Sequence, residues 1–205
     1  MIEEVFHVKL PVNESLSLKR NRFSPPDITQ STRRISIVTG IHGDELEGQY
    51  VCYLLAKWLN ENPEKIKGIV DIYPSMNPMG IDSITRGFPF YDVDINRAFP
   101  GGTSDFLPAQ LAHAIVESVK GSDFAIDIHS SNIFLREIPQ VRISRSSAKE
   151  LVPLAETLGI DFIWVHDAVT VLESTFSHAM NSVGTKTLVV EMGVGMRITQ
   201  SYGED

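Results

Sequence analysis

Hydrophobic residues along this chain recur with two periods, one typical of buried strands and the other typical of amphipathic helices. Runs rich in Val, Ile, Leu and Phe predict strands at 5–10, 33–41, 68–77, 122–131, 139–144, 161–167 and 185–193. Helical spacing of apolar residues predicts helices at 46–60, 107–120, 146–159 and 174–184. Strands that alternate with helices in this way indicate an α/β sandwich around a largely parallel sheet.

Two segments interrupt this pattern. Residues 21–32 contain two prolines and are expected to form a loop. Residues 78–107 are rich in Gly, Pro and Asp, and their hydrophobic residues show no clear helical or strand spacing. Long irregular segments are uncommon in compact domains and usually carry function, so we expect the second segment to contribute to a site. In the helix predicted over 146–159, a serine cap is expected at the start, with Pro153 near the first turn.

The ends of three predicted strands carry residues whose side chains can take part in catalysis or metal binding. His42 and Glu45 follow the strand at 33–41, His129 closes the strand at 122–131, and Glu191 lies near the end of the last strand. In open α/β sheets, ligands bind in the crevice outside the carboxyl ends of the strands. We therefore expect these four side chains to face one shared crevice.

Two imidazoles and a carboxylate are the donors that a catalytic zinc ion takes, with a fourth position left for water. His42 and Glu45 are three residues apart across a tight turn, which contains two glycines, and His129 is expected to arrive from a neighbouring strand. Asp127 shares a strand face with His129 and is expected to orient it. An isolated His-x-x-Glu pair is common by chance, and a lone histidine is more often structural, so the joint placement carries the prediction.

The long segment supplies two candidate arginines, Arg86 and Arg97, the second preceded by Asn96. An arginine fork binds a carboxylate through two parallel hydrogen bonds, and a neighbouring amide adds a donor. An arginine nearer the metal stabilises an oxyanion as it forms. The alternative is that these arginines make surface ion pairs with Asp92 and Asp94.

Composition narrows the range of partners. The chain has 205 residues, so one domain is expected. Its formal net charge is −8. The acidic balance argues against nucleic acid and anionic membranes as partners, because both favour clustered Lys and Arg.

The single cysteine of the chain, Cys52, is expected to be a buried packing residue on a helix. The N-terminus lacks the basic start of a signal peptide and no run reaches about 18 apolar residues, so we expect a cytoplasmic protein.

Six motifs occur together in this sequence: GIHGDE at 40–45, NPMG at 77–80, TR at 85–86, DVDINRAFPG at 92–101, DIHSS at 127–131 and VVEMG at 189–193. In this order the motifs resemble the succinylglutamate desuccinylase/aspartoacylase family of zinc carboxypeptidase-like metallohydrolases. The resemblance covers residues 34–193. It implies a three-layer α/β/α sandwich of the phosphorylase/hydrolase-like type, with a mixed eight-stranded sheet.

The resemblance also implies roles for individual residues. His42, Glu45 and His129 match the ligands of one zinc ion, and Glu191 matches the general base. Arg86 matches the arginine that polarises the scissile carbonyl. The pair that holds the substrate carboxylate is matched by Asn96 and Arg97.

The implied activity is hydrolysis of the amide bond of a small N-acyl amino acid. Asp44, which precedes the ligand glutamate, favours the deacylase branch over the peptidases, which often have a basic residue there. We expect residues 1–205 to form a single catalytic domain, without the β-rich C-terminal domain that family members usually have. Two alternatives stay open: a zinc metallocarboxypeptidase, and a non-catalytic module that binds zinc or a small molecule. Glu191 weighs against the second, because a binding module needs no base.

Overall fold

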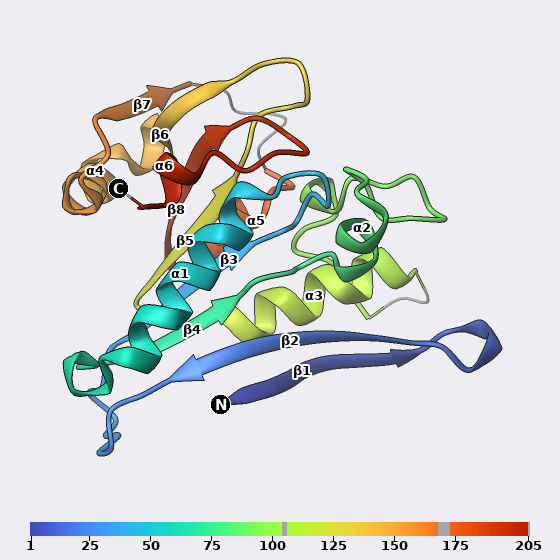
Figure 1. Cartoon of the computed structure of the whole chain (residues 1–205), viewed down its shortest axis with the longest axis horizontal. Coiled ribbons are helices and arrows are strands. Elements are labelled where there is room, and N and C mark those ends of the chain that lie inside the picture. Colours follow the sequence, from blue (N-terminus) through green and yellow to red (C-terminus); the bar gives the residue numbers. More distant parts are fainter. Residues whose placement is uncertain (104–105, 168–172, 205) are drawn as a thin grey trace.

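The structure is a computed structural model that describes residues 1–103, 106–167 and 173–204. Its centre is an eight-stranded sheet with the order β1-β2-β4-β3-β5-β8-β6-β7 (Figure 1). The strands are β1 (Ile2–Lys9), β2 (Ser15–Phe23), β3 (Arg34–Thr39), β4 (Ile69–Tyr73), β5 (Phe124–His129), β6 (Glu137–Ser144), β7 (Phe162–His166) and β8 (Lys186–Gly193).

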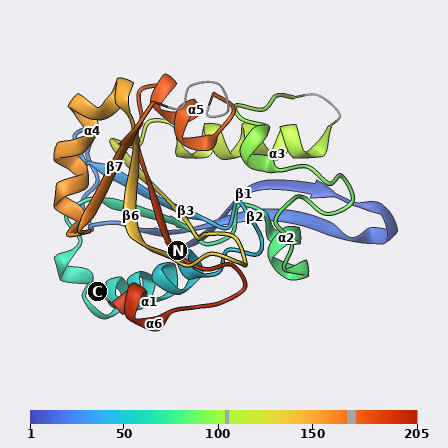
Figure 2. The same ribbon diagram turned by 90° about the horizontal axis from the view of Figure 1, so that it is seen from above.

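Helices cover both faces of this sheet. The helices are α1 (Glu47–Glu61), α2 (Pro78–Ser83), α3 (Leu107–Val119), α4 (Ala148–Ala155), α5 (Phe176–Ser182) and α6 (Gln200–Glu204). Figure 2 shows α1 and α6 on one side of the sheet and α3 and α5 on the other. The predicted three-layer α/β/α architecture is therefore confirmed. Among the residues that the structure describes, no helix is both long and apolar enough to cross a membrane.

The direction of the central strands places the site. β4, β3, β5 and β8 lie side by side and run parallel. The edges make the sheet mixed, because β1 and β2 are antiparallel to their neighbours and the parallel pair β6 and β7 is antiparallel to β8. The carboxyl ends of β3, β5 and β8 consequently meet at one edge, as the sequence predicts.

Three local expectations were wrong. Residues 21–23 belong to β2 rather than to a loop, because Phe23 is buried and Arg22 forms a double hydrogen bond to Asp71 of β4. The segment 78–107 contains α2, a helix too short to show a period, which is capped by the Asn77 side chain. Pro153 lies in the interior of α4, and no side-chain cap bond precedes that helix.

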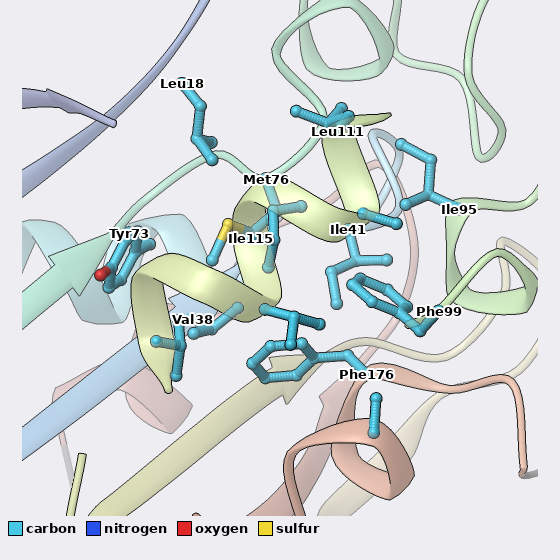
Figure 3. Close-up of a cluster of buried hydrophobic side chains, with 14 of the residues drawn as sticks. Leu18, Val38, Ile41, Tyr73, Met76, Ile95, Phe99, Leu111, Ile115 and Phe176 are labelled. Carbon is cyan, nitrogen blue, oxygen red and sulfur yellow. The ribbon is translucent and has the colours of Figure 1, made fainter. Parts of the chain in front are cut away.

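One of the two hydrophobic clusters that the described residues form fixes the long irregular segment against the sheet. Figure 3 shows Leu111 and Ile115 of α3 among side chains from the sheet and from the segment between α2 and α3. Ile95 is fully buried there, and the ring centres of Phe99 and Phe176 lie 5.4 Å apart. Each such side chain contributes about 1.5–3 kcal/mol of burial free energy, so the cluster holds residues 95–99 in place beside the sheet.

Cys52 lies on α1 and is buried in the second cluster, as predicted. Burial raises the pKa of its thiol to about 12. A thiol in that state packs as a small hydrophobic side chain.

Candidate active site

The turn between β3 and α1 carries the first two predicted ligands. Gly40 has a φ of +71°, which favours glycine. Gly43 lies against α2, where a Cβ atom would stand 2.0 Å from the carbonyl carbon of Gly80. Glycine is therefore required for this close approach, and the compact turn brings His42 and Glu45 to the same side.

Glu45 is the centre of a buried cluster with two histidines. Its Oε1 lies 2.7 Å from Nδ1 of His42, and its Oε2 lies 2.9 Å from Nδ1 of His129. The backbone N–H of Ser130 donates to the same Oε2 at 3.0 Å. One ligand atom from each of the three predicted residues lies within 4.8 Å of the others. The structure thus brings together the three residues that the sequence singled out.

The electrostatics of this cluster depend on shared protons. Burial favours the neutral form of Glu45, but the charges and hydrogen bonds of His129 and His42 outweigh it, and the pKa of Glu45 is lowered. Burial acts against the charged form of His129 as well, but Asp127 and Glu45 raise its pKa well above the ordinary value. Carboxylate and imidazole donors release such protons when they bind a cation.

The donor set fits a divalent metal ion. Two imidazoles and one carboxylate are typical ligands of a catalytic zinc ion, although the same set also accepts cobalt or nickel. Nδ1 of His42 and Nδ1 of His129 both face the Glu45 carboxylate, so the three donor groups converge.

Each histidine also lies next to a second carboxylate. Asp127 Oδ2 is 3.0 Å from His129 Nε2, although the two groups are not aligned for a hydrogen bond. Asp94 Oδ1 is 3.0 Å from His42 Nε2. Carboxylates beside ligand histidines orient the rings and increase their basicity. The contact of Asp127 was predicted, whereas the contact between Asp94 and His42 was not.

Arg86 lies at the opening of the cluster, and its side chain is 47% exposed. Its Nη1 donates to Glu45 Oε1 at 3.1 Å, and its Nη2 donates to Asp94 Oδ2 at 3.2 Å. The alternative expectation of an ion pair with Asp94 is therefore met, and the contact with Glu45 places the same arginine at the candidate metal centre. Two of its five N–H donors serve these carboxylates.

Asn96 and Arg97 lie in a short 3-10 helix, Ile95–Arg97, which the Asp94 side chain caps. The amide oxygen of Asn96 accepts a hydrogen bond from the backbone N–H of Phe176 at 2.9 Å. This bond fixes the amide and leaves its NH2 group as the donor for a ligand. Arg97 is exposed, and its Nη1 donates to the backbone carbonyl of Asn96 at 2.7 Å.

Glu191 faces the cluster from β8, where it pairs in register with His129 of β5. Its side chain is 15% exposed, and Arg142 Nη1 donates to its Oε1 at 3.2 Å. Burial raises the pKa of Glu191 to about 7, while the charges of His129 and Arg142 act in the opposite direction. A carboxylate with a pKa near neutrality is suited to general acid–base chemistry.

These groups share one cavity of about 1040 Å³, whose walls include all the predicted residues: His42, Glu45, Arg86, Asn96, Arg97, His129 and Glu191. Sequence reasoning missed Arg142, Trp164, His166 and His178, which also line it. Side chains alternate along a strand, so the predicted strand at 139–144 could have suggested that Arg142 shares a sheet face with Gln140. The contact of Arg142 with Glu191 of β8 could not be predicted, because it depends on the order of the strands in the sheet.

The charge state of Glu191 gives a testable expectation. In metal-free protein we expect its carboxyl to titrate near pH 7, against about 4.3 for an ordinary glutamate, so it is protonated below that pH and ionised above it. A bound dication lowers this pKa, because it favours the ionised form. ¹³C NMR of carboxyl-labelled protein measures both values, with Glu191→Gln identifying the resonance. Titration at the ordinary value without metal contradicts the expectation.

The sequence matches the succinylglutamate desuccinylase/aspartoacylase catalytic domain over residues 31–202. A succinylglutamate desuccinylase/aspartoacylase from Rhodobacter sphaeroides has a similar structure, with a TM-score of 0.82 and 24% identity over 99% of this chain and 61% of that chain. The product-bound ectoine utilization protein EutE (DoeB) from Ruegeria pomeroyi has a TM-score of 0.80 and 18% identity over 97% of this chain and 62% of that one.

A metallo-carboxypeptidase from Burkholderia cenocepacia is also similar, with a TM-score of 0.71 and 18% identity over 94% of this chain and 55% of that chain. The chain thus spans about 55–62% of the length of these three proteins. No protein among the curated sequences matches it. At these identities the structural likeness establishes the fold.

Proposed function

Because this chain belongs to the succinylglutamate desuccinylase/aspartoacylase family, we propose that it is a zinc-dependent hydrolase that cleaves the amide bond of an N-acyl amino acid. The observation that carries the proposal is the buried cluster of His42, Glu45 and His129, whose ligand atoms lie within 4.8 Å of one another. Glu191 lines the same cavity with a pKa suited to proton transfer. The proposed catalytic unit is one domain.

The proposed chemistry divides between the ion and the side chains of the chain. An ion held by His42, Glu45 and His129 would supply Lewis-acid polarisation and lower the pKa of water to about 7. Glu191 accepts the proton of the attacking water and returns it to the leaving amine. In the metal-free protein burial raises the pKa of Glu191 to about 7, and this burial supports its assignment as the group that exchanges the proton.

Two arginines are proposed to handle the charges of the substrate. Arg86 donates to the carbonyl oxygen as negative charge develops on it, and for this it shifts one N–H from Asp94 or Glu45. Arg97 binds the substrate carboxylate through its planar fork, with the amide NH2 of Asn96 as a further donor.

Replacement of Arg97 by methionine is expected to raise KM and lower kcat/KM by about 10- to 100-fold, the usual loss when a hydrogen bond to a charged group is removed. Steady-state kinetics with an N-acyl amino acid measure this change. Arg33→Met is the control, because Arg33 is an exposed arginine paired with Asp123 on a different surface pocket. Equal effects of the two substitutions would remove Arg97 from the carboxylate clamp.

The panel that tests the function contains N-acetyl-aspartate, N-succinyl-glutamate and a blocked dipeptide, assayed with zinc-loaded protein. Hydrolysis of an N-acyl amino acid supports the deacylase. A second candidate, a metallocarboxypeptidase, is favoured by the similarity of fold to the protein from Burkholderia cenocepacia. It predicts release of the C-terminal residue from the blocked dipeptide alone, and a binding module predicts zinc uptake without hydrolysis of any of the three.

A further inference from the structure

Arg142 lies in the cavity wall and is held from three sides. Its Nη1 donates to Oε1 of Glu191 at 3.2 Å, and its Nη2 donates to Oε2 of Glu137 at 2.5 Å. The centre of its guanidinium also lies 5.2 Å from the ring centre of Trp164. An arginine bound by two carboxylates and an aromatic face has little freedom to rotate.

The pairing of three strands brings these groups together. Arg142 of β6 is opposite Val189 of β8 on one side and opposite Trp164 of β7 on the other. Side chains alternate along a strand, so Glu191, two residues beyond Val189, lies on the same face as Arg142. The contact is thus built on strands of the sheet, which hold side chains more accurately than loops do.

The far side of the guanidinium is fixed as well. Glu137 Oε2 accepts a hydrogen bond from Gln140 Nε2 at 2.8 Å in addition to the bond from Arg142. The side chains of Arg142 and Glu137 are 27% and 17% exposed. Because Glu137 holds one nitrogen of the fork, the other is directed at Glu191.

The carboxylate of Glu191 has two oxygens, and the arginine engages Oε1. Building on the proposed function, we propose that Arg142 is a positioning residue, which fixes the Glu191 carboxylate through Oε1 so that Oε2 receives and returns the proton. A base held in this way keeps one orientation toward His42, Glu45 and His129 throughout the reaction.

The competing explanation is that Arg142 merely links β6 to β8. The chain offers a matched control for this role in Arg22, which links β2 to β4. Arg22 donates to both oxygens of Asp71 at 2.7 Å and lies 3.9 Å from Glu3. Its side chain is 24% exposed, close to the value for Arg142, and it lies outside the cavity.

The test compares Arg142→Met and Arg142→Lys with Arg22→Met, in zinc-loaded protein and at a temperature where thermal unfolding shows each variant folded. We expect Arg142→Met to lower kcat by about 10- to 100-fold, the scale for a misplaced reacting group, with KM changed by less than about twofold. Arg142→Lys should recover part of kcat, because it restores the charge without the planar fork. Arg22→Met should lower the melting temperature and leave kcat unchanged.

A wild-type kcat for Arg142→Met overturns the proposal. A raised KM with unchanged kcat does the same, because it makes Arg142 a substrate-binding residue. A crystal structure of Arg142→Met gives a readout that needs no turnover: we expect the Glu191 carboxylate to leave its place, and an unmoved carboxylate counts against positioning. If wild-type protein hydrolyses no compound of the panel but Glu191 moves in the variant, the proposed function fails and the positioning contact stands.

Discussion

Glu191→Gln is expected to abolish most of the hydrolysis, with kcat/KM falling by about 10²- to 10⁴-fold, the usual contribution of a general acid–base group. Glutamine has nearly the same shape but cannot accept the proton of water. In the metal-free protein burial raises the pKa of its carboxyl to about 7, as expected of a group placed to exchange a proton. Zinc content should stay at the wild-type level, because Glu191 is not among the three clustered ligands. Kinetics and elemental analysis of the same sample measure both effects.

The control for this substitution is Glu150→Gln. The Glu150 side chain is 66% exposed and pairs with Lys186, away from the cavity. An exposed pair of this kind contributes little, so activity should stay at the wild-type level. If Glu191→Gln hydrolyses substrate as fast as this control does, Glu191 is not the base.

Glu45→Ala is expected to have the largest combined effect on activity and stability. Glu45 contacts His42, His129, Ser130 and Arg86, and all but the last are buried. Its removal takes away a metal ligand and the charge that faces both histidines, so hydrolysis should fall to background. In metal-free protein we expect a loss of about 3–5 kcal/mol in the free energy of unfolding, typical of removing one partner of a buried ion pair. Urea unfolding in the presence of a chelator measures this loss.

A buried glutamate two residues away provides the matched control. Glu47 is 1% exposed, and its carboxylate accepts from the backbone N–H of Thr199 at 2.9 Å. Glu47→Ala should therefore also destabilise the fold, but without loss of hydrolysis in the folded protein. Equal activity of the two folded variants would show that Glu45 has only a structural role.

The parts of the site that the sequence predicted are those that depend on strand direction. In a parallel sheet, strand ends far apart along the chain meet at one edge. His42 after β3, His129 at the end of β5 and Glu191 in β8 are brought together in this way. The glycines at 40 and 43 indicated a tight turn in the sequence. In the structure, Gly43 is required because Gly80 approaches it closely.

The parts that escaped prediction depend on contacts between distant residues. β2 was not predicted as a strand. Arg20 and Arg22 give its sequence a polar appearance, although both side chains reach Asp71 of β4. The role of Asp94 beside His42 depends on the path of the irregular segment, which the core around Phe99 fixes. Neither secondary-structure propensity nor hydrophobic periodicity reports contacts between residues that are far apart in the sequence.

The central claim is that His42, Glu45 and His129 hold one divalent ion. Calorimetric titration of zinc into metal-free wild-type protein, Glu45→Ala and Glu47→Ala tests it most directly. The geometry of the cluster predicts one site per chain in wild-type protein and in Glu47→Ala, and loss of that site in Glu45→Ala. Zinc binding by Glu45→Ala with unchanged affinity, or no binding by wild-type protein, would contradict the claim.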